Sequence, residues 1–568
     1  MKKIILGLIA LFSFTGWSQT QTINTGELHG NFQFDGQLYV RDSILDPNKE
    51  AYPDEKFLGQ GFMNLIYTRG GFTAGVRYEN YQNVMIGFPQ GYRGEGITYR
   101  FLQYNTHGLD VTAGNFYEQF GSGMILRAYE ERGLGYDNVF DGARVKYSKN
   151  GVTVKGMIGR QRKYFDKSSG IVRGVDAEVN LNELFSGMSE NKTLITVGGS
   201  FVSKYEPDNS PIYNLPKNVG TWGGRVNVQR GGLGIYAEYV YKINDPSSDN
   251  NFIYRPGEGL TFAINYANKD FGFMVSGKRI DNMSYRSERN AQQIETLINY
   301  IPAGTRYHTY TLPALYPYAT QINGEQNLQV EFTYNLHKKT VLGGKYGTQL
   351  FANFAYAGSI YKSKIDEDTD IGQTGTDGYD TEWFKLGQVK YYQDFNVGFK
   401  RKLNKKWKMT FTYLNVQYNF DLLNKGLRDE VMIKKTPSII YLNEFVLEMQ
   451  YKIKPKHYLR FEVQGLFSEQ DSVGRAFDEL GAGSMVLGLI EYSISPHWFF
   501  SVQNIYNFGN PNENFRLNYP FVNVAYSDGP TRIQLGYGRQ PSGIFCVGGV
   551  CRFVPASNGL QMSITSNF

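Results

Sequence analysis

Few side chains in this 568-residue sequence have the types and spacing that catalysis requires. The six histidines are scattered, and no His pair at i and i+4 or Cys-X-X-Cys cluster is present to bind a metal. No Gly-X-Ser-X-Gly segment marks a hydrolase nucleophile. His29 with Asp35 or Asp110 is the one acid–base arrangement to consider, but a lone strand histidine more often has a structural role. We therefore expect a protein without enzymatic activity and without a cofactor.

The two cysteines, Cys546 and Cys551, have a spacing that suits a disulfide. They flank Val-Gly-Gly-Val at residues 547–550, and Gly-Gly strongly favours a two-residue hairpin turn. With that turn the valines form the hydrogen-bonded pair, and the cysteines form the next, non-hydrogen-bonded pair. Their Cα atoms would then stand about 4.5 to 5 Å apart, within the range of a disulfide bond. An exported chain meets an oxidising compartment, so we expect a disulfide at the outward-facing tip of a loop at 540–557.

A third candidate site is a dense mixture of charges between positions 115 and 138. Glycines in this segment permit tight bends. Two interpretations stay open. The segment could fold inward and pair with charges of other elements such as Arg77, Arg144, Lys155 and Arg225, or it could be a solvated surface loop. The charged residues of this cluster are Glu118, Arg127, Glu130, Glu131, Arg132 and Asp137.

The elements that must position these residues are strands. The chain contains 64 Gly, 43 Tyr and 39 Phe, and its mean hydropathy is −0.41. After the N-terminal segment no apolar run of about 18 residues appears, which excludes a helical membrane protein. The lack of a Gly-X-Y period and of sustained heptads, together with the aromatic content, excludes collagen, coiled coil and general disorder. A very large all-β chain remains.

The first residues are typical of an export signal. Two lysines precede an apolar run at residues 4–14, and Gly16 and Ser18 occupy the −3 and −1 positions of a cleavage site. We therefore predict a signal peptide at residues 1–18. Without the two lysines the formal net charge falls from +6 to +4 (6 − 2). A charge so close to balance gives no indication of a nucleic-acid partner.

Period-2 alternation runs along the rest of the chain. It marks about 24 segments of roughly 9 to 15 residues, the length of a strand that crosses a bilayer at a tilt. Tight turns rich in Gly, Asn and Pro alternate with longer connections, a rhythm typical of bacterial outer-membrane barrels. We therefore predict that residues 19–568 form one all-β domain, a transmembrane antiparallel β-barrel of about 24 strands. Its short turns would be periplasmic and its long loops extracellular, in the outer membrane of a Gram-negative bacterium.

Several stretches resemble known outer-membrane proteins. The final strand ends in Phe568 and looks like the assembly signal that the barrel-insertion machinery reads. Other stretches resemble an uncharacterised family of large Bacteroidota outer-membrane β-barrel proteins, a resemblance that implies location and architecture but no settled biochemical function. These stretches are GNFYEQFGSG at 114–123 with YEER at 129–132, NYIP at 299–302 with LYPY at 315–318, and CVGGVCR at 546–552.

The predicted size raises the question of what closes the lumen. Twenty-four strands tilted by about 40° give a backbone diameter of roughly 48 Å, wide enough to breach the membrane if open. Only residues 19–26 precede the first strand, too few for a globular plug domain. We therefore expect closure by the chain's own loops, 115–138 and 285–326, or by another protein. In the second loop Ser287 and Pro302 are expected to cap and end an amphipathic helix.

Two functions fit this barrel. The first is an accessory or docking subunit of a multi-protein outer-membrane assembly for secretion, barrel insertion or surface-lipoprotein export. The second is a loop-gated transport channel or porin for an unknown solute. The absence of a plug domain favours the first, because a partner could fill the lumen.

The expected partners are outer-membrane lipid and lipopolysaccharide, the barrel-insertion machinery during biogenesis, and other outer-membrane proteins or lipoproteins. Lysines clustered at proposed short turns predict a basic periplasmic face.

Overall fold

The computed structural model describes residues 26–45, 54–291, 294–470, 481–547 and 550–568. The predicted signal peptide at 1–18 lies outside the described residues. Within the range 545–552 the backbone is described where it forms strands, while the side chains are not.

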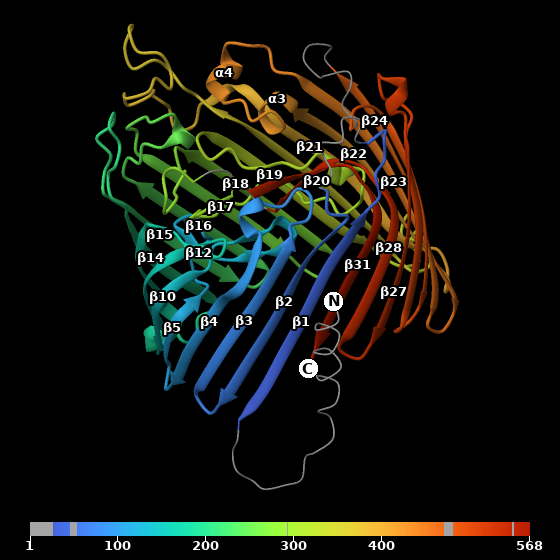
Figure 1. Cartoon of the computed structure of the whole chain (residues 1–568), viewed down its shortest axis with the longest axis horizontal. Coiled ribbons are helices and arrows are strands. Elements are labelled where there is room, and N and C mark those ends of the chain that lie inside the picture. The colour runs from blue at the N-terminus through green and yellow to red at the C-terminus, as the bar shows by residue number, and fades with distance from the viewer. Residues whose placement is uncertain (1–25, 46–53, 292–293, 471–480, 548–549) are drawn as a thin grey trace.

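Antiparallel strands form one closed β-barrel (Figure 1). The main sheet has 25 strands, of which the two-residue β12 (Asp166–Lys167) only extends a loop, and the other 24 make the wall. Strand β1 pairs with β31 from Asn31↔Asn567 to Tyr39↔Gly559, and this pairing closes the ring. The predicted barrel of about 24 strands is confirmed. The wall strands are β1 (Glu27–Tyr39), β2 (Phe57–Arg69), β3 (Phe72–Asn83), β4 (Gly94–Thr106), β5 (Leu109–Phe116), β10 (Phe140–Lys149), β11 (Val152–Lys163), β13 (Ile171–Asn180), β14 (Thr193–Tyr205), β15 (Asn218–Arg230), β16 (Leu233–Lys242), β17 (Gly257–Ala267), β18 (Phe271–Asp281), β19 (Glu325–Leu336), β20 (Thr348–Ile360), β21 (Leu386–Lys402), β22 (Trp407–Asn419), β23 (Ile439–Lys454), β24 (His457–Gln470), β25 (Met485–Ile494), β26 (Trp498–Asn507), β27 (Asn518–Asp528), β28 (Thr531–Gln540) and β31 (Ser557–Asn567).

The two faces of the wall differ in polarity because side chains alternate along each strand. On β24, Val463 and Phe467 are exposed on the outer face, whereas Glu462 and Gln464 point into the lumen and are buried. Large apolar side chains are exposed in the same way on the outer faces of strands around the wall. Such a continuous exposed apolar surface is unusual for a protein in water and typical of a wall that faces lipid.

The two ends of the barrel differ in the length of their connections. Tight turns lie at one end, as predicted, including those at 69–71, 107–108 and 230–232. Two connections at this end are longer than expected: 181–192, with the short helix α2 (Leu181–Leu184), and 337–347. The long connections lie at the opposite end, where Figure 1 shows α3 (Phe420–Leu423) and α4 (Asp429–Ile433). None of the helices among the described residues is long and apolar enough to cross a membrane.

Two loops fill the lumen at the end of the long connections, and we call them the plug loops. The first covers residues 117–139, between β5 and β10, and the second covers 282–324, between β18 and β19. Their apolar side chains form a shared buried cluster in which Phe120 and Met124 of the first loop pack with Ile298 and Ile301 of the second. The interior of this half of the barrel is therefore a packed core made by the chain itself.

The other half of the lumen is accessible to water. Along the inward face of β24, the exposed fraction falls from 28% for the side chain of Arg460 to 3% for Glu462, 1% for Gln464 and 0% for Leu466. Arg460 is the nearest of these residues to the tight turns, so the accessible part lies at that end. We call it the vestibule.

The helix expected in the second plug loop is wrong, since the described residues between Ser287 and Pro302 contain none. Their backbone groups bond to other segments instead: Arg127 N–H donates to Ile298 O, and Tyr300 N–H donates to Gly123 O. Thr296 has a positive φ of 51°, which an α-helix does not allow. The apolar periodicity serves packing between two loops rather than one helical face.

Candidate functional site

The first plug loop is a series of short paired segments held between wall strands. Strand β6 (Gln119–Phe120) pairs with β7 (Leu126–Arg127), and β8 (Glu130–Glu131) pairs with β9 (Tyr136–Asp137). A 3₁₀ turn, η2 (Arg132–Leu134), joins the second pair and ends at Gly135, whose φ of 66° favours glycine. These turns bring the charged residues of the loop back toward the wall.

Two arginines of the wall clamp this loop through buried ion pairs. Arg77 of β3 lies 2.7 Å from Asp137, 2.9 Å from Glu130 and 2.7 Å from Glu79 of its own strand. Arg162 of β11 lies 2.7 Å from Asp137 and 2.6 Å from Glu79. Arg77, Glu79 and Arg162 are all nearly inaccessible to water. Because the charges are buried, each pair depends on its partner and the network acts as one unit.

The electrostatics of the network keep the loop carboxylate ionised. Burial alone would raise the pKa of Asp137, but the guanidinium groups of Arg162 and Arg77 outweigh it and hold that pKa below the ordinary value. The Tyr117 hydroxyl also donates to Asp137, at 3.0 Å. Asp137 therefore remains a charged anchor throughout the physiological pH range.

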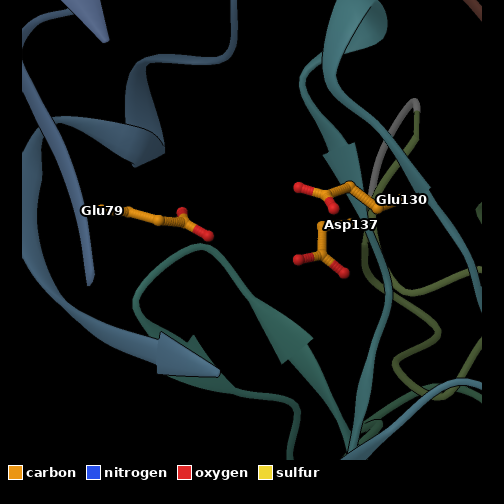
Figure 2. Close-up of side chains that lie close together, drawn as sticks. All are labelled: Glu79, Glu130 and Asp137. Carbon is orange, nitrogen blue, oxygen red and sulfur yellow. The ribbon is translucent and has the colours of Figure 1, made fainter. Parts of the chain in front are cut away.

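The same carboxylates are close enough together to raise the question of a metal. Oxygens of Glu79, Glu130 and Asp137 lie within 4.8 Å of one another. Figure 2 shows Glu79 reaching from one side and Glu130 and Asp137 from the other. The guanidinium of Arg77 contacts all three carboxylates, so a cation already neutralises this space. This donor set fits arginine rather than a metal ion.

The structure also places the other charged residues of the first loop. Glu118 lies 2.9 Å from Lys155 and 3.6 Å from Arg144, both on the lumen wall. Arg127 stacks over the ring of Tyr300, 4.1 Å from its centroid, and so ties the two plug loops together. Of the two interpretations of this loop, the structure shows the inward-folded one.

Three further charged residues named in the sequence analysis take no part in the ion pairs of Arg77 and Arg162. Arg132 lies 2.9 Å from Glu130 and also bonds to Gln33 of β1. Glu131 accepts a hydrogen bond from the N–H of Gly133 and pairs with no wall cation in its described contacts. Arg225, named above as a possible partner of the loop, pairs instead with Asp176 and Glu178 of the wall.

The second plug loop also reaches the wall strands β21 and β24, a contact that we did not predict. Within it an extended segment, residues 303–318, contacts β21 and then β24, and we call this segment the strap. Arg306 donates to Asn396 at 3.0 Å, and His308 Nε2 lies 2.8 Å from Asp394, both on β21. Farther on, Leu312 N–H donates to Gln464 of β24 at 2.8 Å. The polar residues at every second position, Arg306, His308 and Tyr310, were the available signal for an extended strap.

The predicted disulfide hairpin also covers the plug. Strands β29 (Gly543–Val547) and β30 (Val550–Val554) pair with Cys546 opposite Cys551, which is the expected register. The two cysteine side chains lie outside the described residues, so the disulfide stays a prediction. The hairpin contacts η2 and η5 (Pro313–Leu315) of the two plug loops. The hairpin therefore lies against both plug loops.

Two other candidate groups are placed by the structure. Phe568, proposed as the assembly signal, exchanges two backbone hydrogen bonds with Gly30 of β1, so it completes the closing seam of the barrel. Its recognition by the insertion machinery stays a prediction. His29 lies 3.4 Å from Glu27, while Asp35 bonds Gln33 and Ser563, so no His–Asp arrangement forms there.

Comparisons with known proteins bear on architecture. A family model described as "Family of unknown function (DUF6029)" matches residues 1–568. A search of curated proteins finds no match. Among solved structures, the P pilus usher (PapC) translocation pore aligns at 10% identity and a TM-score of 0.43, over 95% of this chain and 99% of that chain. The siderophore receptor PirA from Pseudomonas aeruginosa aligns at 7% identity and a TM-score of 0.41, over 96% and 81%. All of these are large β-barrels, and at these values the likeness gives no information about function.

Proposed function

Because the chain belongs to the family of unknown function DUF6029, whose description assigns no activity, we propose a function from its geometry: a non-enzymatic outer-membrane channel closed by its own plug loops. The observation that carries this proposal is the division of the lumen into a water-accessible vestibule and a plugged half. The wall stays polar beneath the plug, where Lys155, Arg144 and Asp394 meet loop residues. A polar wall is what a pore needs once its loops move.

Part of the plug is held by polar contacts that a gate could exchange, although its apolar residues form a packed core. The strap residues Arg306 and His308 each make one side-chain hydrogen bond to the wall in their described contacts, and the guanidinium of Arg306 also lies 5.3 Å from the ring centroid of Phe351. A cavity of about 440 Å³ lies between this strap and β17–β19, lined in part by Ser276, Lys278 and Gln329. Polar contacts of this kind can exchange for contacts with a solute or with water at small net cost. We infer that the strap moves first and that a small polar solute enters this cavity.

Liposome swelling tests the channel proposal. Vesicles containing the wild-type protein are diluted into isosmotic solutions of neutral sugars of increasing size. We expect slow uptake by the wild type and faster uptake by a double variant, Arg306→Ala with His308→Ala, that releases the strap. The matched control is His497→Ala, a histidine exposed at the tight-turn end. Equal and negligible uptake by both folded variants contradicts the proposal.

A docking role remains the second candidate, favoured by one observation. The loop at 337–347, at the tight-turn end, exposes Val341 at 96% and Leu342 at 70% beside Lys338 and Lys339. An exposed apolar pair flanked by cations suits a protein partner that is acidic at its rim. The plug loops close half of the lumen by themselves, so closure of the barrel does not require a partner. Photo-crosslinking from Leu342 in intact cells tests it: without a discrete crosslinked protein, the docking role fails.

A further inference from the structure

Basic side chains gather on the outer face of the wall, over β4, β11 and β13, where these strands approach the long loops. We call this group the outer basic cluster. It consists of Arg100, Arg160, Lys167 and Arg173.

The register places this cluster on the lipid-facing side. Arg100 stands opposite Val76, and Arg173 stands opposite Ile158, whose side chain is exposed. Arg144 of β10 is on the opposite face of the wall: it points into the lumen and pairs with Asp110. The cluster is therefore outside the barrel and separate from the plug network.

The cluster has more positive than negative charge. Asp141 is the carboxylate at its centre: Arg100 lies 3.2 Å and Lys167 2.6 Å from the same oxygen, and Arg160 is the cross-strand partner of Asp141. Arg173 donates to the amide oxygen of Asn218 rather than to a carboxylate. Two of the four cations thus pair with one carboxylate, Arg160 stands across from it, and Arg173 has no carboxylate partner in its described contacts. The nearby outward Glu95 accepts from Tyr78 and Asn80, and Asp166 accepts from the backbone of Lys167.

An aromatic row marks the level of the cluster on the wall. Phe201, Trp222 and Tyr241 are cross-strand neighbours on the outer faces of β14, β15 and β16, and the last two rings lie 4.9 Å apart. Val175 stands opposite Phe201, and Arg173 lies two residues farther toward the long loops. Aromatic rows of this kind mark the boundary between the apolar core of a bilayer and its headgroups. The cluster therefore lies at headgroup level.

Another outward arginine of this wall has more carboxylates around it. Arg279 of β18 has Glu258 and Asp281 within 4 Å, at 3.7 and 3.6 Å, and the ring of Trp383 covers it at 4.4 Å. The outer basic cluster has no comparable balance of anions. Guanidinium groups bind phosphate oxygens in bidentate fashion, so phosphate is the anion that this arrangement suits.

We propose that the outer basic cluster binds the phosphate groups of a phosphorylated lipid of the outer leaflet, of the phosphorylated-disaccharide class exemplified by lipid A. This inference rests on the proposed membrane location and not on conduction. Binding there would fix the height and orientation of the β4–β13 sector in the membrane. The side chains that provide the site lie on strands and one tight hairpin, so the site exists without a conformational change.

Native mass spectrometry of the purified full-length protein tests this site. Diphosphorylated lipid A is titrated into the detergent-solubilised protein, and the bound fraction is measured. For the triple variant Arg100→Gln, Arg160→Gln and Lys167→Gln, we expect at least about tenfold weaker binding. Asp141→Asn, which removes the central anion, should bind more tightly than the wild type. The matched control removes three cations at the tight-turn end: Lys402→Gln, Lys405→Gln and Lys406→Gln.

The outcomes separate the possible sources of the phosphate. Equal binding by the triple variant and the wild type, or an equal loss in the control, overturns the proposal. Displacement of lipid A by millimolar inorganic phosphate also overturns it, because that result indicates a site for free anion. Heat-modifiable gel migration checks folding, and Arg173→Gln alone is the variant to use if the triple variant does not fold. Conductance should be unchanged in all these variants, so failure here leaves the channel proposal intact.

Discussion

The guanidinium of Arg77 lies 2.7 Å from the carboxylate of Asp137, a residue 60 positions later in the chain. Arg77 belongs to a wall strand and Asp137 to the first plug loop, and both are buried. The plug is thus bound to the inside of the barrel by charges that have lost their water. A loop held in this way is part of the folded structure, and its release requires the whole network to find other partners.

Removing the anion of this pair should loosen the plug. In Asp137→Ala, Arg77 and Arg162 lose a shared buried partner, and we expect docking of the first plug loop to weaken by about 3 to 5 kcal/mol. Limited trypsin digestion checks this, since Arg127 and Arg132 provide cleavage sites within the loop. Faster cleavage there, with an intact barrel on unheated gels, is the expected result. Glu131→Ala is the control, because Glu131 bonds only to the N–H of Gly133 in its described contacts.

A steric variant should displace the plug without touching its charges. Gly174 of β13 faces the lumen, and a Cβ added there would lie 2.7 Å from the ring of Phe120, which is fully buried. We expect Gly174→Val to push Phe120 away from the wall and to raise trypsin cleavage of the loop. Gly156 on the neighbouring β11 lies on the outer face, with no atom within 4 Å of an added Cβ, so Gly156→Val should leave the plug as it is in the wild type. Equal digestion of both variants would show that Phe120 does not help to hold the plug.

The loop that carries α4 should respond to pH. Lys362 lies 3.1 Å from Asp429 and 2.9 Å from Glu430, and burial raises the pKa of Asp429 to about 6 despite this cation. Since the folded-state pKa lies above the ordinary value of about 4, the resulting stabilisation is complete at pH 4 and is lost as the pH rises through 6. Hydrogen exchange at residues 426–435 should therefore be less protected at pH 8 than at pH 5, after correction for intrinsic rates.

Two variants separate this effect from a general loss of structure. Asp429→Asn should remove the pH dependence and keep the protection seen at pH 5. Asp421 has the opposite behaviour: although it is buried, the Ser438 N–H and Lys425 hold its pKa below the ordinary value. Asp421→Asn should therefore reduce protection at both pH values. If Asp429→Asn keeps the pH dependence of the wild type, another group is responsible.

The barrel could be predicted from the sequence because its determinants are local. Alternation on strands such as β24 and turn residues such as those at 107–108 act over a few positions, so each strand and turn could be identified on its own. The exceptions were the connections at 181–192 and 337–347, which lie at the tight-turn end but are longer than a tight turn. No local sequence pattern predicts the length of these two connections.

The site was less predictable because it depends on contacts between distant segments. The charges of 115–138 indicated possible pairing, but a sequence does not show that Asp137 meets Arg162 or that Arg225 is taken by Asp176. The second plug loop resembles a helix in sequence because Ile294, Leu297, Ile298 and Ile301 have helical spacing, and this prediction is wrong. In the structure these side chains pack against the first loop, and tertiary contacts override local propensity.

The disulfide between Cys546 and Cys551 remains a prediction with a direct test. The backbone register of β29 and β30 places the two residues opposite each other. Mass spectrometry of the non-reduced protein after alkylation should find a linked peptide. The closed loop is short, so reduction should change barrel stability by at most roughly 2 kcal/mol. Two alkylated cysteines would exclude the bridge.

Single-channel conductance across a planar bilayer tests the central claim most directly. The comparison is between the wild-type protein and a variant in which residues 303–318, the strap of the second plug loop, are replaced by a flexible Gly-Ser linker. If the chain's own loops close a polar pore, the wild type should be closed or show small steps, and the variant should show steps at least about tenfold larger. A variant that is folded and inserted but conducts no more than the wild type would contradict the account.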